Sequence, residues 1–208
     1  MAPMPRTKMR RQPQLQRGQR RVDAILRAAV AVFDTQGYEA ATTNAIARRA
    51  RASIGSLYQF FPNKEAILQA VVTRHRAEMA ELFGRLITAE TLRLPTRVIV
   101  DNVIDGSADF IDAHVGFGRI FWHSPASPRL AAIAAQLDDE IIDRVDAGLA
   151  LRYPHLTARR RRLHAAVTVT MLKALLALAD SSPARERGLV LAEVKSVLAH
   201  YLDQIDAS

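Results

Sequence analysis

The feature that most constrains the fold is the spacing of apolar residues, which follows a helical period along most of the 208-residue chain. From Arg20 to Gln36, for example, Val22, Ile25, Ala29 and Phe33 recur at steps of three or four residues, positions that share one face of a helix. Alanine, leucine and arginine are abundant and favour helices, whereas runs of β-branched residues are short. The sequence therefore predicts an all-α protein of about nine helices.

The N-terminal third is expected to hold an arm followed by a small helical module. Residues 1–17 are rich in Pro, Gln and Arg without an apolar period, which predicts a flexible basic arm. The first helix is expected from Arg20 to Gln36, and Gly37 supplies its C-terminal stop. The predicted boundaries are 18–64 for the module and 65–208 for a larger helical part.

The stretch 42–65, "TTNAIARRARASIGSLYQFFPNKE", predicts two short helices and the start of a long one. Thr42 or Thr43 can cap the first, Ser53 the second, and Asn63 a helix that runs on to about Ile87. Two short helices joined by about four residues are typical of a helix-turn-helix, whose second helix enters the major groove of DNA.

The charge distribution supports a polyanionic partner for the same region. Residues 1–64 contain 12 Lys and Arg against 3 Asp and Glu, while residues 65–208 contain 17 against 18. All the excess positive charge therefore lies in the first third, as expected for one nucleic-acid-binding region joined to a near-neutral remainder. A nonspecific or architectural nucleic-acid-binding protein would explain the charge but not the large neutral part.

The segment "TTNAIARRARASIGSLYQFFPNKEAIL" resembles the signature of the TetR family of bacterial transcriptional repressors, and the resemblance covers roughly residues 20–70. The matching positions are Thr42, Thr43, Ile46, Ala47, Ser53, Gly55, Ser56, Leu57, Tyr58, Phe61 and Lys64. The resemblance implies a dimeric, sequence-specific regulator that leaves a palindromic operator when a small hydrophobic ligand binds its C-terminal domain. Double-stranded DNA, a small-molecule effector and a second copy of the chain are therefore the expected partners.

The predicted DNA contacts fall on this motif. We expect Tyr58 and Lys64 to contact phosphates, assisted by Arg51 and the N-terminal arm. The complete predicted set is Thr42, Thr43, Asn44, Arg51, Ser53, Gly55, Ser56, Tyr58, Gln59 and Lys64. Two positions depart from the family pattern, because Arg51 replaces a common turn glycine and Phe60 replaces a His or Tyr. A left-handed conformation at Arg51 would cost on the order of 1 kcal/mol.

The C-terminal part predicts further helices and two functions. Helices are expected after Pro95 to about His114, and over about 127–151, 157–179 and 183–205. The last two carry apolar residues on more than one stripe, which predicts burial against both the core and a second copy of the chain. The two reading helices of the dimer would then lie roughly 34–36 Å apart or at a related spacing. Burial of these two helices inside a monomer is the alternative.

An effector pocket is predicted where aromatic residues gather, between Phe110 and Trp122. Its expected lining is Phe110, His114, Phe117, Phe121, Trp122 and Met171. A nearby acidic stripe at helical spacing consists of Asp101, Asp105, Asp109 and Asp112. Such a stripe is more typical of the solvent-exposed face of a helix; the alternative is a site for a metal or a cationic ligand, and the stripe favours a cationic or neutral apolar effector over an anionic one.

Several function classes are disfavoured. Histidines such as His123, His155 and His200 are scattered without an HExxH or similar spacing, so neither an enzyme nor a metal site or cofactor is predicted. The chain has no cysteine, which excludes disulfides and fits the cytoplasm. No uninterrupted apolar run approaches the eighteen or so residues of a membrane span.

Overall fold

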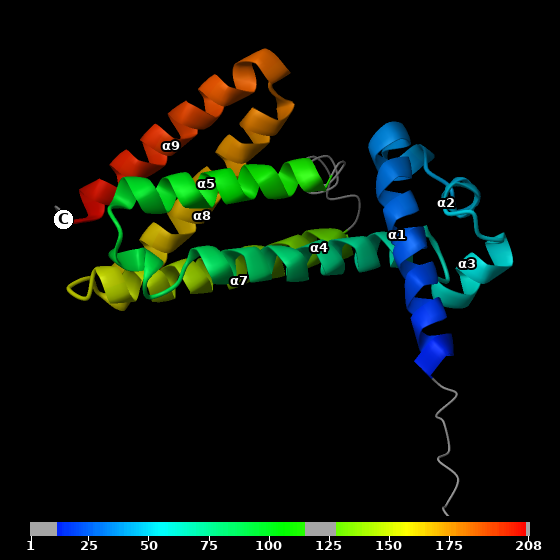
Figure 1. Ribbon diagram of the computed structural model, residues 1–208. Coiled ribbons are helices and arrows are strands. Elements are labelled where there is room, and N and C mark those ends of the chain that lie inside the picture. The colour runs from blue at the N-terminus through cyan, green and yellow to red at the C-terminus, as the bar shows by residue number, and fades with distance from the viewer. Residues whose placement is uncertain (1–11, 115–127, 207–208) are drawn as a thin grey trace, which may run out of the picture. The chain divides into compact units, whose positions relative to one another are not determined.

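The computed structural model describes residues 12–114 and 128–206. Within these ranges the chain forms eight α-helices and one short 3-10 helix, with no strand. The residues divide into two compact units at Val71 and Val72. The first unit contains α1 to α3, shown in blue and cyan in Figure 1, and the second contains the helices from α5 onward. An all-α fold is therefore confirmed.

The first unit consists of α1 (Gln12–Ala40), α2 (Thr43–Arg49), α3 (Ile54–Phe60) and the start of α4 (Lys64–Leu86). In this unit α2 packs against both α1 and α3. The buried apolar side chains include most of those the helical period predicts, although Val22 is only half-buried, and they hold the two short helices in place. They include Ile25, Leu26, Ala29, Val32, Phe33, Ile46, Ala47, Leu57, Phe61, Ile67, Leu68 and Val71.

The first helix is longer than the sequence predicts at both ends. It begins at Gln12 rather than Arg20, so residues 12–17 are helical and do not belong to a flexible arm; residues 1–11 lie outside the described ranges. Gln, Leu and Arg are good helix formers, and a proline at the second position needs no N–H donor there. Gly37 does break the helix as predicted, with a positive φ of 75°, and helical backbone continues to Ala40.

The second unit packs the rest of α4 with η1 (Thr91–Arg93), α5 (Thr96–Ala113), α7 (Pro128–Arg152), α8 (Ala158–Ser181) and α9 (Ala184–Asp206). Helix α8 contacts both α7 and α9, and α9 also contacts α5, as can be followed in Figure 1. The bounds agree with the predicted ones to within a few residues. The buried side chains between these helices form one apolar cluster that includes Met79, Phe83, Val100, Ile104, Ile111, Ile141, Val169, Leu172, Leu176, Val194 and Leu198.

Ion pairs connect the same helices on their outer faces. Lys195 of α9 pairs with Asp105 of α5 at 2.6 Å, and Arg187 of α9 pairs with Asp112. The acidic stripe of α5 is therefore engaged in part by basic residues of α9, so it offers less support for a cationic ligand than the sequence alone indicated.

Helix α8 is long and apolar enough, by length and composition only, to cross a membrane, with a mean hydropathy of 1.5 over its best window. Core helices of water-soluble domains meet the same criterion. Only 28% of this window is buried inside the chain. Apolar side chains such as Leu163 and Leu178 are 62% and 53% exposed. One face of α8 is therefore apolar and uncovered within the described chain.

Candidate nucleic-acid interface and ligand cavity

Three polar side chains fix where the helices of the first unit begin. The Thr42 Oγ1 atom accepts from the backbone N–H of Ala45 at 3.1 Å, and the Ser53 Oγ atom accepts from that of Ser56 at 3.1 Å. Asn63 Oδ1 does the same at the start of α4, accepting from Ala66 at 2.8 Å. Each cap satisfies a backbone donor that has no partner within its helix. The predicted capping roles are confirmed, with Thr42 rather than Thr43 at α2.

The turn between α2 and α3 is a Schellman motif with arginine in the position that usually holds glycine. The backbone N–H of Ala52 donates to Ala47 at 3.0 Å, and that of Arg51 donates to Arg48 at 3.2 Å. Arg51 has a φ of 51°, the one positive φ of a non-glycine residue among those described. Arg51 is therefore left-handed in spite of its side chain, and Arg21 Nη1 donates to the Arg51 carbonyl at 3.3 Å. This contact from α1 helps to hold the strained turn.

The exposed side of α2 and α3 brings hydroxyl groups together. Thr43 Oγ1 and the Tyr58 hydroxyl lie 3.1 Å apart in a hydrogen bond, although the residues are fifteen positions apart in sequence. Tyr58 is 50% exposed, so its ring is not part of the core. Asn44 and Gln59 are exposed as well. These groups form a polar, accessible surface of the type that contacts phosphates and base edges.

Gly55 stands on this surface in the first turn of α3. It is exposed, and a Cβ atom added at this position would meet nothing within 4 Å. Its φ is not in the positive range either, since among the described glycines only Gly37 has a positive value. Neither packing nor backbone conformation therefore requires glycine here, which leaves close approach of an external partner as a reason for it.

Lys64 has contacts that the sequence did not indicate. Its Nζ atom donates to the backbone carbonyls of Tyr38 at 2.6 Å and Glu39 at 3.0 Å, and it lies 4.4 Å from the centroid of the Tyr38 ring. The ammonium therefore ties the start of α4 to the end of α1. One of its three N–H donors is left over after these two bonds, so the phosphate contact stays a prediction.

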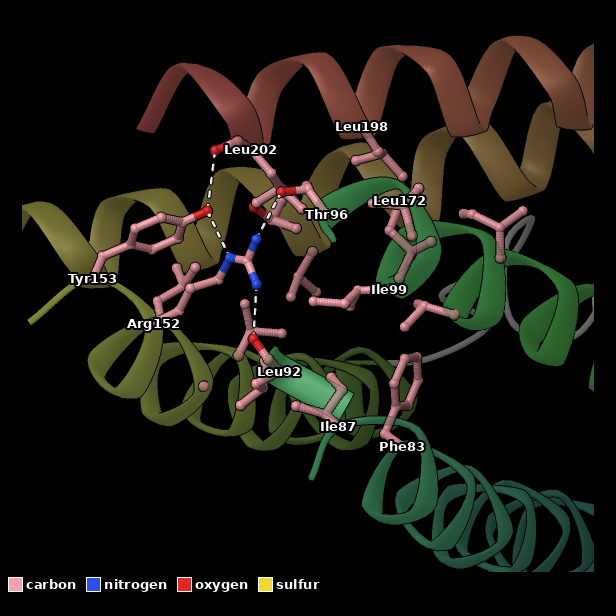
Figure 2. A pocket seen from close by; sticks show the side chains of 18 residues that line it. Phe83, Ile87, Leu92, Thr96, Ile99, Arg152, Tyr153, Leu172, Leu198 and Leu202 are labelled. Atoms are coloured by element: carbon pink, nitrogen blue, oxygen red, sulfur yellow. Dashed lines mark hydrogen bonds between the residues drawn. The ribbon is translucent and has the colours of Figure 1, made fainter. Parts of the chain in front are cut away.

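A second candidate site is an apolar cavity of about 90 Å³ inside the second unit. Side chains from α4, η1, α5, α7, α8 and α9 line it, as Figure 2 shows, including Phe83, Ile87, Leu92, Ile99, Leu172 and Leu198. The lining is predominantly aliphatic; Arg152, Tyr153 and Thr96 border the cavity at one end, but its accessible surface is apolar. Mostly apolar walls are typical of small-molecule sites.

Arg152 organises the polar end of the cavity. Its Nη1 atom donates to the carbonyl of Leu92 at 2.7 Å, and its Nη2 atom donates to Thr96 Oγ1 at 3.0 Å (Figure 2). Nη1 also donates to the carbonyl of Leu94 at 2.9 Å. Its Nε atom donates to the Tyr153 hydroxyl at 3.2 Å. No carboxylate among the described residues pairs with this guanidinium, and four of its five donors are used. Nothing in the local sequence singled out Arg152, because all of its partners except Tyr153 lie 56 to 60 positions away.

The predicted pocket residues lie elsewhere in the described part of the chain. Phe110, His114 and Met171 do not line the cavity. Phe110 instead stacks on His114, with ring centroids 4.1 Å apart, and borders a smaller cavity of about 30 Å³. Phe117, Phe121 and Trp122 fall outside the described residues.

Comparison with known proteins finds a family model that matches each unit of the chain. Residues 25–71 match the family model described as "Bacterial regulatory proteins, tetR family". Residues 95–202 match a second model, "Tetracyclin repressor-like, C-terminal domain". Together the two models cover the helix-turn-helix region and most of the second unit.

Individual relatives agree with these models. A 49-residue stretch, 24% of this chain, is 49% identical to the A-factor receptor protein of Streptomyces griseus, and it spans only 18% of that receptor. A TetR-family transcriptional regulator from Streptomyces coelicolor has the same fold, with a TM-score of 0.62 and 24% identity, over 88% of this chain and 98% of the other. FadR from Bacillus subtilis, solved in complex with stearoyl-CoA, gives a TM-score of 0.61 at 17% identity, over 85% of this chain and 97% of that one.

Proposed function

Because the chain belongs to the TetR family of bacterial regulatory proteins, we propose that it is a cytoplasmic repressor that binds a palindromic DNA operator as a homodimer. A small hydrophobic ligand in the second unit would release it from the operator. The observation that carries the DNA-binding half is the exposed surface of α2 and α3, where Thr43 and Tyr58 are joined and Gly55 is free of internal packing.

Electrostatics favour the same surface. The excess of Lys and Arg is confined to residues 1–64, and Arg48, Arg49 and Arg51 surround the turn that precedes the reading helix α3. All three are exposed, and the described structure places none of their side chains in an ion pair. Basic side chains in this position neutralise backbone phosphates and make the affinity strongly dependent on salt.

The uncovered apolar face of α8 and α9 supports dimerisation through these two helices. They pack side by side, and both expose large apolar side chains: Leu163 and Leu178 from α8, Leu189 and Val197 from α9. Covering such a face with its own copy would produce a two-fold, four-helix interface. Leu198 beside it is only 3% exposed and belongs to the monomer core. An interface test should therefore alter Val197 and leave Leu198 in place.

The cavity around Arg152 supports a ligand of particular chemistry. The apolar walls suit a hydrophobic molecule. The Tyr153 hydroxyl already donates to the carbonyl of Leu202 at 3.3 Å, and Arg152 has one N–H donor left, so apolar contacts would carry most of the binding. FadR of Bacillus subtilis was solved with stearoyl-CoA, which carries a long apolar acyl chain, and SmeT with triclosan. At about 90 Å³ the cavity is smaller than the roughly 300–1,000 Å³ of typical ligand sites, so a ligand must displace its walls.

The experiment that tests the central proposal is selection of bound DNA from a random pool by the full chain. The expected product is a two-fold symmetric consensus, bound with a steep dependence of log affinity on log salt concentration. Absence of any enriched sequence, with tight binding at low salt only, would contradict sequence-specific recognition. That result would favour the nonspecific nucleic-acid binder instead.

A further inference from the structure

Three potential metal ligands converge in the second unit at a place that does not line the cavity. His75 and Glu78 lie on α4 and His114 follows the last residue of α5; each offers one ligand atom, and these atoms lie within 4.8 Å of one another. We propose that His75, Glu78 and His114 form a binding site for a divalent transition-metal ion of the zinc type. The proposal does not depend on DNA binding by the first unit.

The two residues of α4 are correctly spaced to bind one metal ion. His75 and Glu78 are three positions apart, so their side chains project from the same face of the helix. Sequence reasoning missed this pair because the third ligand, His114, lies thirty-six positions after Glu78. Only the packing of the α5 end against α4 brings it close.

His114 is oriented as a metal-bound histidine would be. Its Nδ1 atom lies 2.7 Å from the carbonyl oxygen of Phe110, which can only accept, so Nδ1 carries the proton of this bond. In the neutral ring, Nε2 then presents a lone pair on the side of Glu78. Metal-ligating histidines usually donate their second ring N–H to a carbonyl or carboxylate in this way, which fixes the tautomer.

Glu78 supplies the complementary oxygen. Its Oε1 atom is held by Arg74 Nε at 3.1 Å. Its Oε2 atom is buried, lies 3.0 Å from His114 Nε2, and has no hydrogen-bond partner among the described residues. Two ligand atoms of one shared ion lie close together without a hydrogen bond between them, as Glu78 Oε2 and His114 Nε2 do here. With bonds of about 2.0–2.2 Å, neighbouring ligands of a tetrahedral ion stand roughly 3.3 Å apart.

His75 completes the set. It is buried, and its ring centroid lies 5.0 Å from that of His114. Two imidazole nitrogens and one carboxylate suit Zn²⁺, Co²⁺, Ni²⁺ or Fe²⁺, whereas Mg²⁺ and Ca²⁺ prefer oxygen ligands alone. Three protein ligands leave at least one coordination position for water or another donor.

The test uses the full chain, dialysed against a chelator and then titrated with Co²⁺ as a visible substitute for Zn²⁺. The expected result is saturation at one ion per chain, with a visible absorption band that disappears when Zn²⁺ is added. Absence of saturable Co²⁺ binding would overturn the proposal and leave His114 and Glu78 as an ion pair only.

Substitutions then locate the site. Glu78→Gln and His114→Gln should each weaken Co²⁺ binding by at least about 10- to 100-fold, the loss that altering even an outer partner of a ligand produces. His200→Gln, at an exposed position of α9, is the matched control and should bind as the parent does. Circular dichroism checks that each variant is folded. Parent-like affinity in both folded variants would overturn the assignment.

A measurement on the unaltered chain guards against variants that fail to fold. Zn²⁺ should protect His114 from modification by diethyl pyrocarbonate, as detected by mass spectrometry of peptides. The exposed His155 and His200 should react equally with and without the ion. Equal modification of His114 in both conditions would contradict metal ligation.

Discussion

Replacing Gly55 by alanine should make the protein more stable and a weaker binder of DNA. Gly55 is the second residue of α3, after the Ser53 cap, and an added Cβ would meet nothing within 4 Å. In a helix interior the change from Gly to Ala contributes about 0.8–1.0 kcal/mol, and less in a first turn. We therefore expect the free energy of unfolding of the first unit to rise by about 0.5 kcal/mol.

The effect on DNA binding should have the opposite sign. If α3 lies in the major groove with Gly55 against the duplex, a methyl group must fit into a packed contact. Overpacking a close contact costs about 1–3 kcal/mol, which corresponds to an affinity about 5- to 150-fold lower. No change confined to the stability of the protein produces this combination, because added stability alone cannot weaken binding.

The assay compares the variant with Gly18→Ala, a matched control on α1. An added Cβ at Gly18 also meets nothing within 4 Å, and this residue lies outside the predicted reading surface. Hydrogen exchange of amides in α2 and α3 reports local stability, and fluorescence anisotropy with the selected operator reports affinity at fixed salt. An affinity for Gly55→Ala equal to that of the Gly18→Ala control would refute the placement of Gly55 at DNA. Loss of stability would refute the conclusion that its surroundings are open.

Four other substitutions probe the remaining features. Lys64→Met should lower the free energy of unfolding of the first unit by about 1–2 kcal/mol in urea denaturation, since two partly exposed hydrogen bonds are lost. It should also flatten the slope of log affinity against log salt by about 0.9; an unchanged slope would leave Lys64 with a structural role alone. Arg51→Gly should relieve up to about 1 kcal/mol of left-handed strain, again with a flatter salt slope, and a destabilised variant would contradict this. Val197→Asp should give folded monomers in sedimentation, whereas an intact dimer would place the interface elsewhere. Arg152→Met should lower the stability of the second unit by about 2–4 kcal/mol in thermal unfolding, and a parent-like melting temperature would show that its four hydrogen bonds contribute little.

The parts that could be predicted from the sequence are those decided within a few residues. The caps at Thr42, Ser53 and Asn63 bond to N–H groups three positions later, so the residue type before an apolar run is sufficient to place them. Gly37 and Arg51 could be identified for the same reason, since a helix end needs a particular backbone conformation regardless of the rest of the fold.

The parts that could not be predicted depend on partners far along the chain. Lys64 bonds to carbonyls twenty-five and twenty-six positions earlier, and Arg152 to groups near position 94. Aromatic density predicts a pocket near Phe110, which stays a prediction, whereas the cavity around Arg152 is lined mostly by aliphatic residues from six segments. Aliphatic residues at helical spacing are typical of any core, so the local pattern cannot distinguish a cavity wall from a filled interior.

The contacts around η1 suggest how such a cavity is coupled to α4. Thr91 Oγ1 donates to the carbonyl of Leu86, the last residue of α4, at 2.8 Å, and the N–H of Thr88 donates to Thr91 Oγ1 at 2.8 Å. The same short segment is held by Arg152 through the carbonyls of Leu92 and Leu94. A ligand that enlarges the cavity by displacing Arg152 or Leu92 would act on the C-terminal end of α4 through these contacts.

Helix α4 begins at Lys64 in the first unit, so its far end and its near end belong to different units of the chain. A ligand shifts the balance between DNA-bound and released forms only by the difference in its affinity for the two. We therefore expect that Arg152→Met, which frees η1 from α7, reduces the effect of ligand on DNA affinity more than it reduces DNA affinity itself. Anisotropy titrations of the operator with and without a hydrophobic effector measure both quantities. An unchanged ligand effect in a folded Arg152→Met variant would mean that the signal reaches α4 by another route.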